Sequence, residues 1–130
     1  MVGMNYQHQQ QYLKTKVETA SPGVLTLLLY EEMYRKLKMA KINFLNNQVV
    51  EMLECIGRAR SIMYELLGTL NYDYDISKNL QSLYQFYLAQ LNEFVINRQP
   101  ETLDSIIEFA KEFAETWKQA IQLVKSSKGS

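Results

Sequence analysis

The segment that decides the fold runs from residue 21 to residue 44 and reads SPGVLTLLLYEEMYRKLKMAKINF. Ser21 is a preferred helix N-cap, and Pro22 suits the first helical position, because its missing N–H would have no partner there. Apolar side chains then recur three and four residues apart, at Leu27, Tyr30, Met33, Tyr34, Leu37, Ala40 and Phe44. Only Lys41 interrupts the series, so the spacing predicts one apolar stripe along a long helix.

Three more stripes of the same spacing follow. The second consists of Val49, Met52, Leu53, Ile56, Ala59, Met63, Leu66, Leu67 and Leu70. The third consists of Leu80, Leu83, Tyr84, Tyr87, Leu91, Phe94 and Val95. The fourth consists of Leu103, Ile106, Ile107, Ala110, Phe113, Ala114, Trp117, Ala120, Ile121 and Val124. None of them shows the alternation of a strand, so the sequence predicts four helices.

The connections between these stripes are short. Asn46 and Asn47 are expected to end the first helix and to cap the second, and the Asn/Asp-rich residues 71–75 are typical of a turn. Ser77 is expected to cap the third helix, and Pro100 to open the fourth. Because short connections make neighbouring helices antiparallel, we predict an all-α, up-down-up-down four-helix bundle.

The ends of the chain differ from this pattern. Residues 1–20 are polar and Gln-rich and carry no apolar period, which predicts a flexible N-terminal arm. The bundle is expected to occupy residues 21–125, followed by a disordered tail at residues 126–130. Three isolated apolar residues on the arm, Tyr12, Leu13 and Val17, are candidates for contact with a partner or for folding back onto the bundle.

The composition excludes several functions. Fourteen Lys and Arg balance fourteen Asp and Glu, which argues against a nucleic-acid binder and against electrostatic docking on anionic membranes. Cys55 is the single cysteine, and a free thiol suits a reducing compartment. No segment has the apolar core of a signal peptide or the length of a transmembrane helix. We therefore expect a cytoplasmic protein that does not insert into the membrane.

The chain also lacks recognisable catalytic machinery. His8 is the only histidine, so the paired Glu-x-x-His motifs of a di-iron bundle cannot form. Neither a haem attachment motif nor a Gly-rich phosphate loop is present. A nucleophile formed by Cys55 and His8 is outweighed by a structural role for Cys55 beside the second stripe. We expect no enzyme activity, no cofactor and no metal site.

Apolar residues exceed what a bundle core needs, which is roughly three positions in seven. The candidates for partner binding outside the main stripes are Leu25, Leu28, Met39, Ile42, Ile62, Phe86, Leu88 and Phe109. Val50, Ile96 and Leu123 also fall outside the stripes. Two interpretations stay open: wider stripes bury these residues, or together they form an apolar surface for a partner.

Three motifs resemble a known family. Residues 12–30 read YLKTKVETASPGVLTLLLY, residues 64–71 read YELLGTLN, and residues 116–121 read TWKQAI. They are similar to the signatures of the flagellin-specific export chaperone family (FliS). The chain departs from the family pattern at Glu31-Glu32, where Asp or Asn followed by Gly is common. It departs again at residues 94–99, where an Ala-Asn-x-x-Asn-Asp turn is usual.

The resemblance implies a cytosolic chaperone that binds the disordered C-terminal segment of flagellin, prevents premature polymerisation and delivers it to the flagellar type III export gate. It also implies that Tyr12 matches a family tyrosine on the arm, linked to folding back of the arm and to contact with the gate. The alternative is a bundle that self-associates, as a weak homodimer, or acts as a signalling adaptor.

Overall fold

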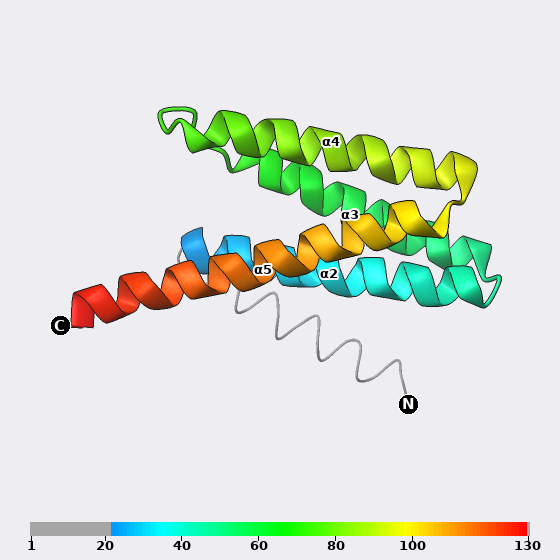
Figure 1. Cartoon of the computed structure of the whole chain (residues 1–130), viewed down its shortest axis with the longest axis horizontal. Coiled ribbons are helices and arrows are strands. Elements are labelled where there is room, and N and C mark those ends of the chain that lie inside the picture. The colour runs from blue at the N-terminus through cyan, green and yellow to red at the C-terminus, as the bar shows by residue number, and fades with distance from the viewer. Residues whose placement is uncertain (1–21, 130) are drawn as a thin grey trace.

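The computed structural model describes the backbone of residues 22–129 and the side chains of residues 23–125. Four helices make up this part of the chain: α2 (Pro22–Leu45), α3 (Val49–Gly68), α4 (Ile76–Asn97) and α5 (Pro100–Gly129). Figure 1 shows that α2 and α4 run in one direction while α3 and α5 run in the other. The predicted all-α, up-down-up-down bundle is therefore confirmed. The N-terminal arm predicted at residues 1–20 lies outside the described residues.

The helices pack in a ring in the order of the sequence. α2 packs against α3 and α5, and α4 packs against the same two helices, so that α2 and α4 lie diagonally opposite. The largest side chains at the centre, each less than 2% exposed, are Tyr30, Met33, Leu37, Met52, Ile56, Ile62, Met63, Leu66, Tyr84, Leu91, Phe94 and Leu103. Every buried side-chain nitrogen or oxygen in the described region has a hydrogen-bond partner. None of the helices in this region is both long and apolar enough to cross a membrane.

Two of the expected helix caps are wrong. Asn47 adopts the left-handed conformation, with φ 57°, which suits a residue that ends α2, but the N-cap of α3 is Gln48, without a side-chain capping bond. Ser77 lies inside α4, and its buried hydroxyl donates to the carbonyl oxygen of Asn71 at 2.5 Å. Ser77 therefore does not cap α4, whose N-cap is Asp75. Its hydroxyl instead ties the start of α4 to Asn71 in the α3–α4 turn.

The connection between α4 and α5 is stabilised by Arg98. Arg98 takes the left-handed position at the end of α4, with φ 56°, and its backbone N–H donates to Phe94 O at 2.8 Å. Its Nε also donates to the carbonyl oxygen of Val95 at 2.8 Å. The side chain thus satisfies a carbonyl at the helix end that has no partner within the helix.

The last helix is longer than expected. α5 continues to Gly129, so the prediction of a disordered tail from residue 126 is wrong for the backbone of residues 126–129. Residues 125–128 contain neither Pro nor Gly, and each residue added to an existing helix gains one hydrogen bond. The C-terminal turns of α5 extend beyond the first turn of α2 (Figure 1), and Leu123 and Val124 are exposed there.

Candidate partner-binding surfaces

An aromatic cluster joins α2, α4 and α5 near the start of α2. The rings of Phe113 and Trp117 on α5 meet the Tyr30 ring edge-on, with centroids 5.5 and 6.1 Å away. The Tyr30 hydroxyl hydrogen-bonds the hydroxyl of Tyr84 on α4, and the Trp117 indole N–H donates to Gly23 O at 2.8 Å. Burial, and then the proximity of Tyr84, raises the pKa of Tyr30. Tyr30 and Tyr84 are buried in this cluster, whereas Phe113 and Trp117 are partly exposed at its outer side.

The aromatic contacts continue outward between α4 and α5. The Phe109 ring lies 4.6 Å from Phe113 and is stacked on Tyr87, with centroids 3.9 Å apart. Phe86 packs edge-on against Tyr87 at 5.0 Å and is 53% exposed. A large aromatic side chain thus stands in solvent on a rigid aromatic base. This is an arrangement that an apolar partner could cover without any change in the core.

The structure separates the candidate residues into two groups. Leu28, Ile62, Leu88 and Phe109 are buried, so wider stripes account for them and they do not line the surface of this conformation. The stripes are wider than three positions in seven because each helix packs against two neighbours and buries both flanks. Leu25 is partly buried.

The other candidates have surface positions. Met39, Ile42 and Phe86 are exposed, and so are Val50, Ile96 and Leu123. Met39 and Ile42 lie on α2 near the α2–α3 turn, whereas Phe86 lies on α4. The candidates on the arm, Tyr12, Leu13 and Val17, lie outside the described residues.

Other exposed apolar side chains were not among the predicted candidates for partner binding. These are Leu45, Val49, Leu53, Tyr64, Tyr72, Tyr74, Ile76 and Val124. Val49, Leu53 and Val124 were placed in the apolar stripes, but they are exposed, so that expectation is wrong for these three residues. The only available signal was their position within a turn or two of a predicted helix end, where burial is incomplete.

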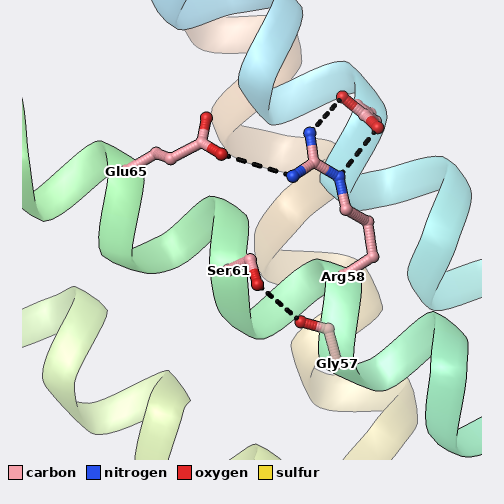
Figure 2. A network of polar contacts seen from close by, with 5 residues as sticks. Gly57, Arg58, Ser61 and Glu65 are labelled. Atoms are coloured by element: carbon pink, nitrogen blue, oxygen red, sulfur yellow. Dashed lines mark hydrogen bonds and ion pairs between the residues drawn. The ribbon is translucent and has the colours of Figure 1, made fainter. Parts of the chain in front are cut away.

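A polar groove lies between α2 and α3. Its lining residues are Glu32, Lys36, Met39, Asn43, Glu51, Glu54, Cys55 and Arg58. The Arg58 guanidinium donates to both carboxylate oxygens of Glu32, each at 3.1 Å, and to Glu65 at 3.3 Å. Figure 2 shows Arg58 reaching from α3 toward Glu65 of the same helix on one side and toward α2 on the other. This fork–fork pair ties α2 to α3 on the outside of the bundle.

Cys55 at the base of this groove has a structural role. Its side chain is 8% exposed, and burial is the main cause that raises the pKa of its thiol. The nearest polar contact is the Asn43 amide, whose nitrogen lies 3.7 Å from the sulfur. A protonated thiol beside an amide is not an activated nucleophile. In the part of the chain that the structure describes, no cluster of His, Cys, Asp or Glu could hold a metal ion.

Comparison with known proteins agrees with this arrangement. Residues 4–124 match the family described as "Flagellar protein FliS". The "Flagellar secretion chaperone FliS" of Bacillus subtilis (strain 168) is 30% identical over 111 residues, which cover 85% of this chain and 84% of that protein. The protein of the same name from Vibrio cholerae serotype O1 is 28% identical over 116 residues, covering 85% of each chain.

A solved structure shares the fold. "Crystal structure of flagellar chaperone from bacteria" superposes with a TM-score of 0.72 at 20% sequence identity. The similarity covers 91% of this chain and 98% of that one, so the whole bundle is shared. The family match extends over nearly the full sequence, including the motifs around Tyr30, Leu66 and Trp117. The chain therefore belongs to the FliS family of flagellar secretion chaperones, which are binding proteins and not enzymes.

Proposed function

We propose that the client of this chaperone is the C-terminal segment of flagellin, which it holds in the cytosol and delivers to the flagellar type III export gate. Bound in this way, the segment cannot polymerise before secretion. The relatives' name, flagellar secretion chaperone, supports a flagellar export substrate as the client. The choice of flagellin, of its C-terminal segment and of the export gate extends the sequence resemblance.

The observation that carries the proposal is the apolar surface that lies outside the buried core. Phe86 is 53% exposed although its neighbours Tyr87 and Phe109 are stacked and Phe109 is buried. The buried core therefore does not require phenylalanine at position 86, and a smaller polar residue there would leave the core intact. Exposed aromatic groups on rigid supports are typical anchors for a partner.

The chemistry of the client fits this surface. A segment that is disordered in solution and amphipathic when helical can lay its apolar face along a helix pair, with anchors three and four residues apart. Ordering of the client costs conformational entropy, which lowers the affinity per unit of buried area but allows a large surface to be wrapped. A chaperone that must later release its client benefits from that moderate affinity.

Calorimetry tests the proposal. A peptide covering about the last forty residues of flagellin should bind with a negative heat-capacity change, the sign of apolar burial. Because the chain has no net charge, the affinity should depend only weakly on salt.

Phe86→Glu should weaken binding at least about tenfold, since it places a charge where apolar contact is required. Tyr64→Glu is the matched control, because Tyr64 is 60% exposed but lies on α3. Absence of binding at micromolar peptide, or equal loss in both variants, would contradict the proposal.

The arm gives a further test. Residues 1–18 are tethered to the start of α2, and a tethered segment has a millimolar effective concentration near its anchor. We propose that Tyr12, Leu13 and Val17 cover part of the client's site, so removing residues 1–18 should tighten peptide binding several-fold. Weaker binding after removal would show that the arm instead contributes contacts to the bound client.

Tyr12→Ala should leave the melting temperature unchanged but impair delivery of the client to the export gate. Normal motility of a strain carrying this variant would contradict a role for Tyr12 in delivery.

A further inference from the structure

We propose that the α3–α4 turn is a docking site for an arginine-bearing segment of a partner protein other than the client. The turn comprises residues 69–75 and reads TLNYDYD. Figure 1 shows it at one end of the bundle, clear of α2 and α5. It is separate from Phe86, which lies in the middle of α4, so the proposal does not depend on the identity of the client.

Large side chains stand in solvent at this turn. Tyr72 is 50% exposed, Tyr74 66% and Ile76, the first residue of α4, 61%. Neither tyrosine belongs to the buried core or to the partly buried residues packed against it. Single exposed apolar residues are ordinary on a protein surface, but here three of them fall within five positions. Packing within the described chain does not account for the two rings.

The turn is held in shape without the tyrosine side chains. The Asn71 side-chain oxygen accepts a hydrogen bond from the backbone N–H of Asp73 at 3.0 Å. The Asn71 carbonyl oxygen accepts one from the N–H of Tyr74 at 3.2 Å and one from the hydroxyl of Ser77 at 2.5 Å. Ser77 is only 4% exposed, so this last bond is shielded from water. Side chains on a turn fixed in this way lose little conformational entropy when a partner binds.

Two carboxylates alternate with the two rings. Among the described residues, Asp73 and Asp75 have no basic group within ion-pair distance, and this holds for Lys78, the nearest basic residue along the chain. Asp75 is the N-cap of α4 but makes no side-chain capping bond. Carboxylates at this position favour the positive end of a helix, so by themselves they do not indicate a partner. The exposed rings beside them do, because a helix start does not require tyrosine.

This combination of groups selects arginine. A guanidinium can stack on the face of a tyrosine ring while its N–H groups donate to a neighbouring carboxylate. A lysine ammonium carries the charge but lacks the planar face. The phosphates of a nucleic acid or an anionic membrane would be repelled by Asp73 and Asp75. A wholly apolar partner would remove water from both carboxylates without replacing their hydrogen bonds.

A peptide titration followed by nuclear magnetic resonance tests the proposal. The probe is a short peptide in which arginine and glycine alternate, added to the isotope-labelled full-length protein. We expect a dissociation constant on the order of 100 µM that rises with added salt, and the largest amide shifts at residues 71–78. The matching lysine–glycine peptide should bind at least about threefold more weakly. Absence of binding at millimolar peptide, equal binding of the two peptides, or largest shifts elsewhere would overturn the proposal.

Two double variants separate the rings from the charges. Tyr72→Ser/Tyr74→Ser removes both rings and keeps the carboxylates, whereas Asp73→Asn/Asp75→Asn removes the charges and keeps the rings. Each should weaken binding of the arginine peptide at least about fivefold, since stacking and charge act on the same guanidinium. The amide spectrum of each variant should match that of the wild type outside the turn. Full affinity in either double variant would overturn the proposal.

Matched controls carry the same chemical changes elsewhere. Glu108→Gln/Glu112→Gln removes two exposed carboxylates from α5 and should leave the affinity for the arginine peptide unchanged. Phe86→Ser removes an exposed aromatic ring from α4 and should also leave it unchanged. An equal loss in either control would mean that the peptide reports general acidity or general apolar contact, and the proposal would be wrong.

Competition separates this site from that of the client. Protein saturated with the flagellin peptide should bind the arginine peptide with unchanged affinity, because the turn and Phe86 lie on different parts of the bundle. This result holds or fails independently of whether flagellin is the natural client. Displacement of one peptide by the other would show that the turn belongs to the client's site, and the proposal of a separate partner would be overturned.

Discussion

The hydroxyl groups of Tyr30 on α2 and Tyr84 on α4 hydrogen-bond to each other inside the core, where the two residues are 1% and 2% exposed. α2 and α4 are diagonal in the bundle and otherwise share little contact. The pair therefore links the two helices that the ring of neighbours does not join directly. Because the bond needs both hydroxyls in place, it also fixes the position of α4 along α2.

Removing either hydroxyl should destabilise the protein more than removing both. Tyr30→Phe or Tyr84→Phe leaves one buried hydroxyl without its partner, which costs about 1–3 kcal/mol. The double variant removes both polar groups together, so its free energy of unfolding should return toward the wild-type value. Urea unfolding of the four proteins measures the coupling. Additive losses in the double variant would contradict the pairing.

The same tyrosines predict a loss of stability at alkaline pH. Burial raises the pKa of both side chains above the ordinary tyrosine value of 10.0. Above about pH 10 the unfolded chain releases these protons while the folded chain keeps them, so the free energy of unfolding falls as pH rises. Melting temperatures between pH 8 and 11 should show this decline. Cys55, whose pKa is also raised by burial, adds to it from about pH 9.

The control for this pH dependence is the double variant Tyr30→Phe/Tyr84→Phe. It retains Cys55 and the exposed tyrosines but lacks both buried hydroxyls. Its melting temperature should therefore decline less steeply than that of the wild type above pH 10. An identical slope in the two proteins would mean that the buried tyrosines do not control alkaline stability.

The Arg58 fork should contribute modestly to stability. Its side chain is 39% exposed and that of Glu32 24%, so solvent screens the pair. Arg58→Lys keeps the charge but loses the two parallel bonds to Glu32, and it should cost about 0.5 kcal/mol. Arg35→Lys, at an arginine without an ion pair in the described chain, is the matched control and should cost nothing measurable. Equal effects in chemical unfolding would show that the fork geometry is irrelevant.

Much of the architecture follows from the sequence because the four stripes are long and their connections are short. Spacing correctly predicted α2 to α5 and the opening of α5 at Pro100. It did not predict that Ile62 is fully buried, because stripe width depends on how many neighbours a helix has. The role of Ser77 depends on the path of the turn that brings Asn71 O within reach, and local sequence does not encode that path.

The candidate surfaces were predictable only in part. Phe86, Met39 and Ile42 stand outside the stripes and are exposed, so their spacing identified them. Which charged side chains pair between α2 and α3 was not visible in the sequence. Arg58 is paired and Arg35 is not, yet both are arginines near acidic residues in the chain. Only the packing of α2 on α3 decides which cation has a carboxylate within reach.

Trp117 should hold the first turn of α2 against α5. It is the only tryptophan, and its indole N–H donates to Gly23 O at 2.8 Å. Trp117→Phe keeps a ring beside Tyr30 but removes the donor, which should cost about 1 kcal/mol of stability. The loss should be local, because the bond lies at the end of a helix and opening there does not require the core to unfold.

Hydrogen exchange can locate this effect. In the Trp117→Phe variant, amides in the first turns of α2 should exchange several-fold faster, while those around Met33 and Leu37 should keep their protection. Gly23→Ala is the matched control: a Cβ there would make ordinary contact with Ile121 at 3.9 Å, and alanine favours the helix, so exchange should slow or stay the same. Uniform acceleration of exchange across all four helices would mean that Trp117 stabilises the whole bundle and not only the first turn of α2.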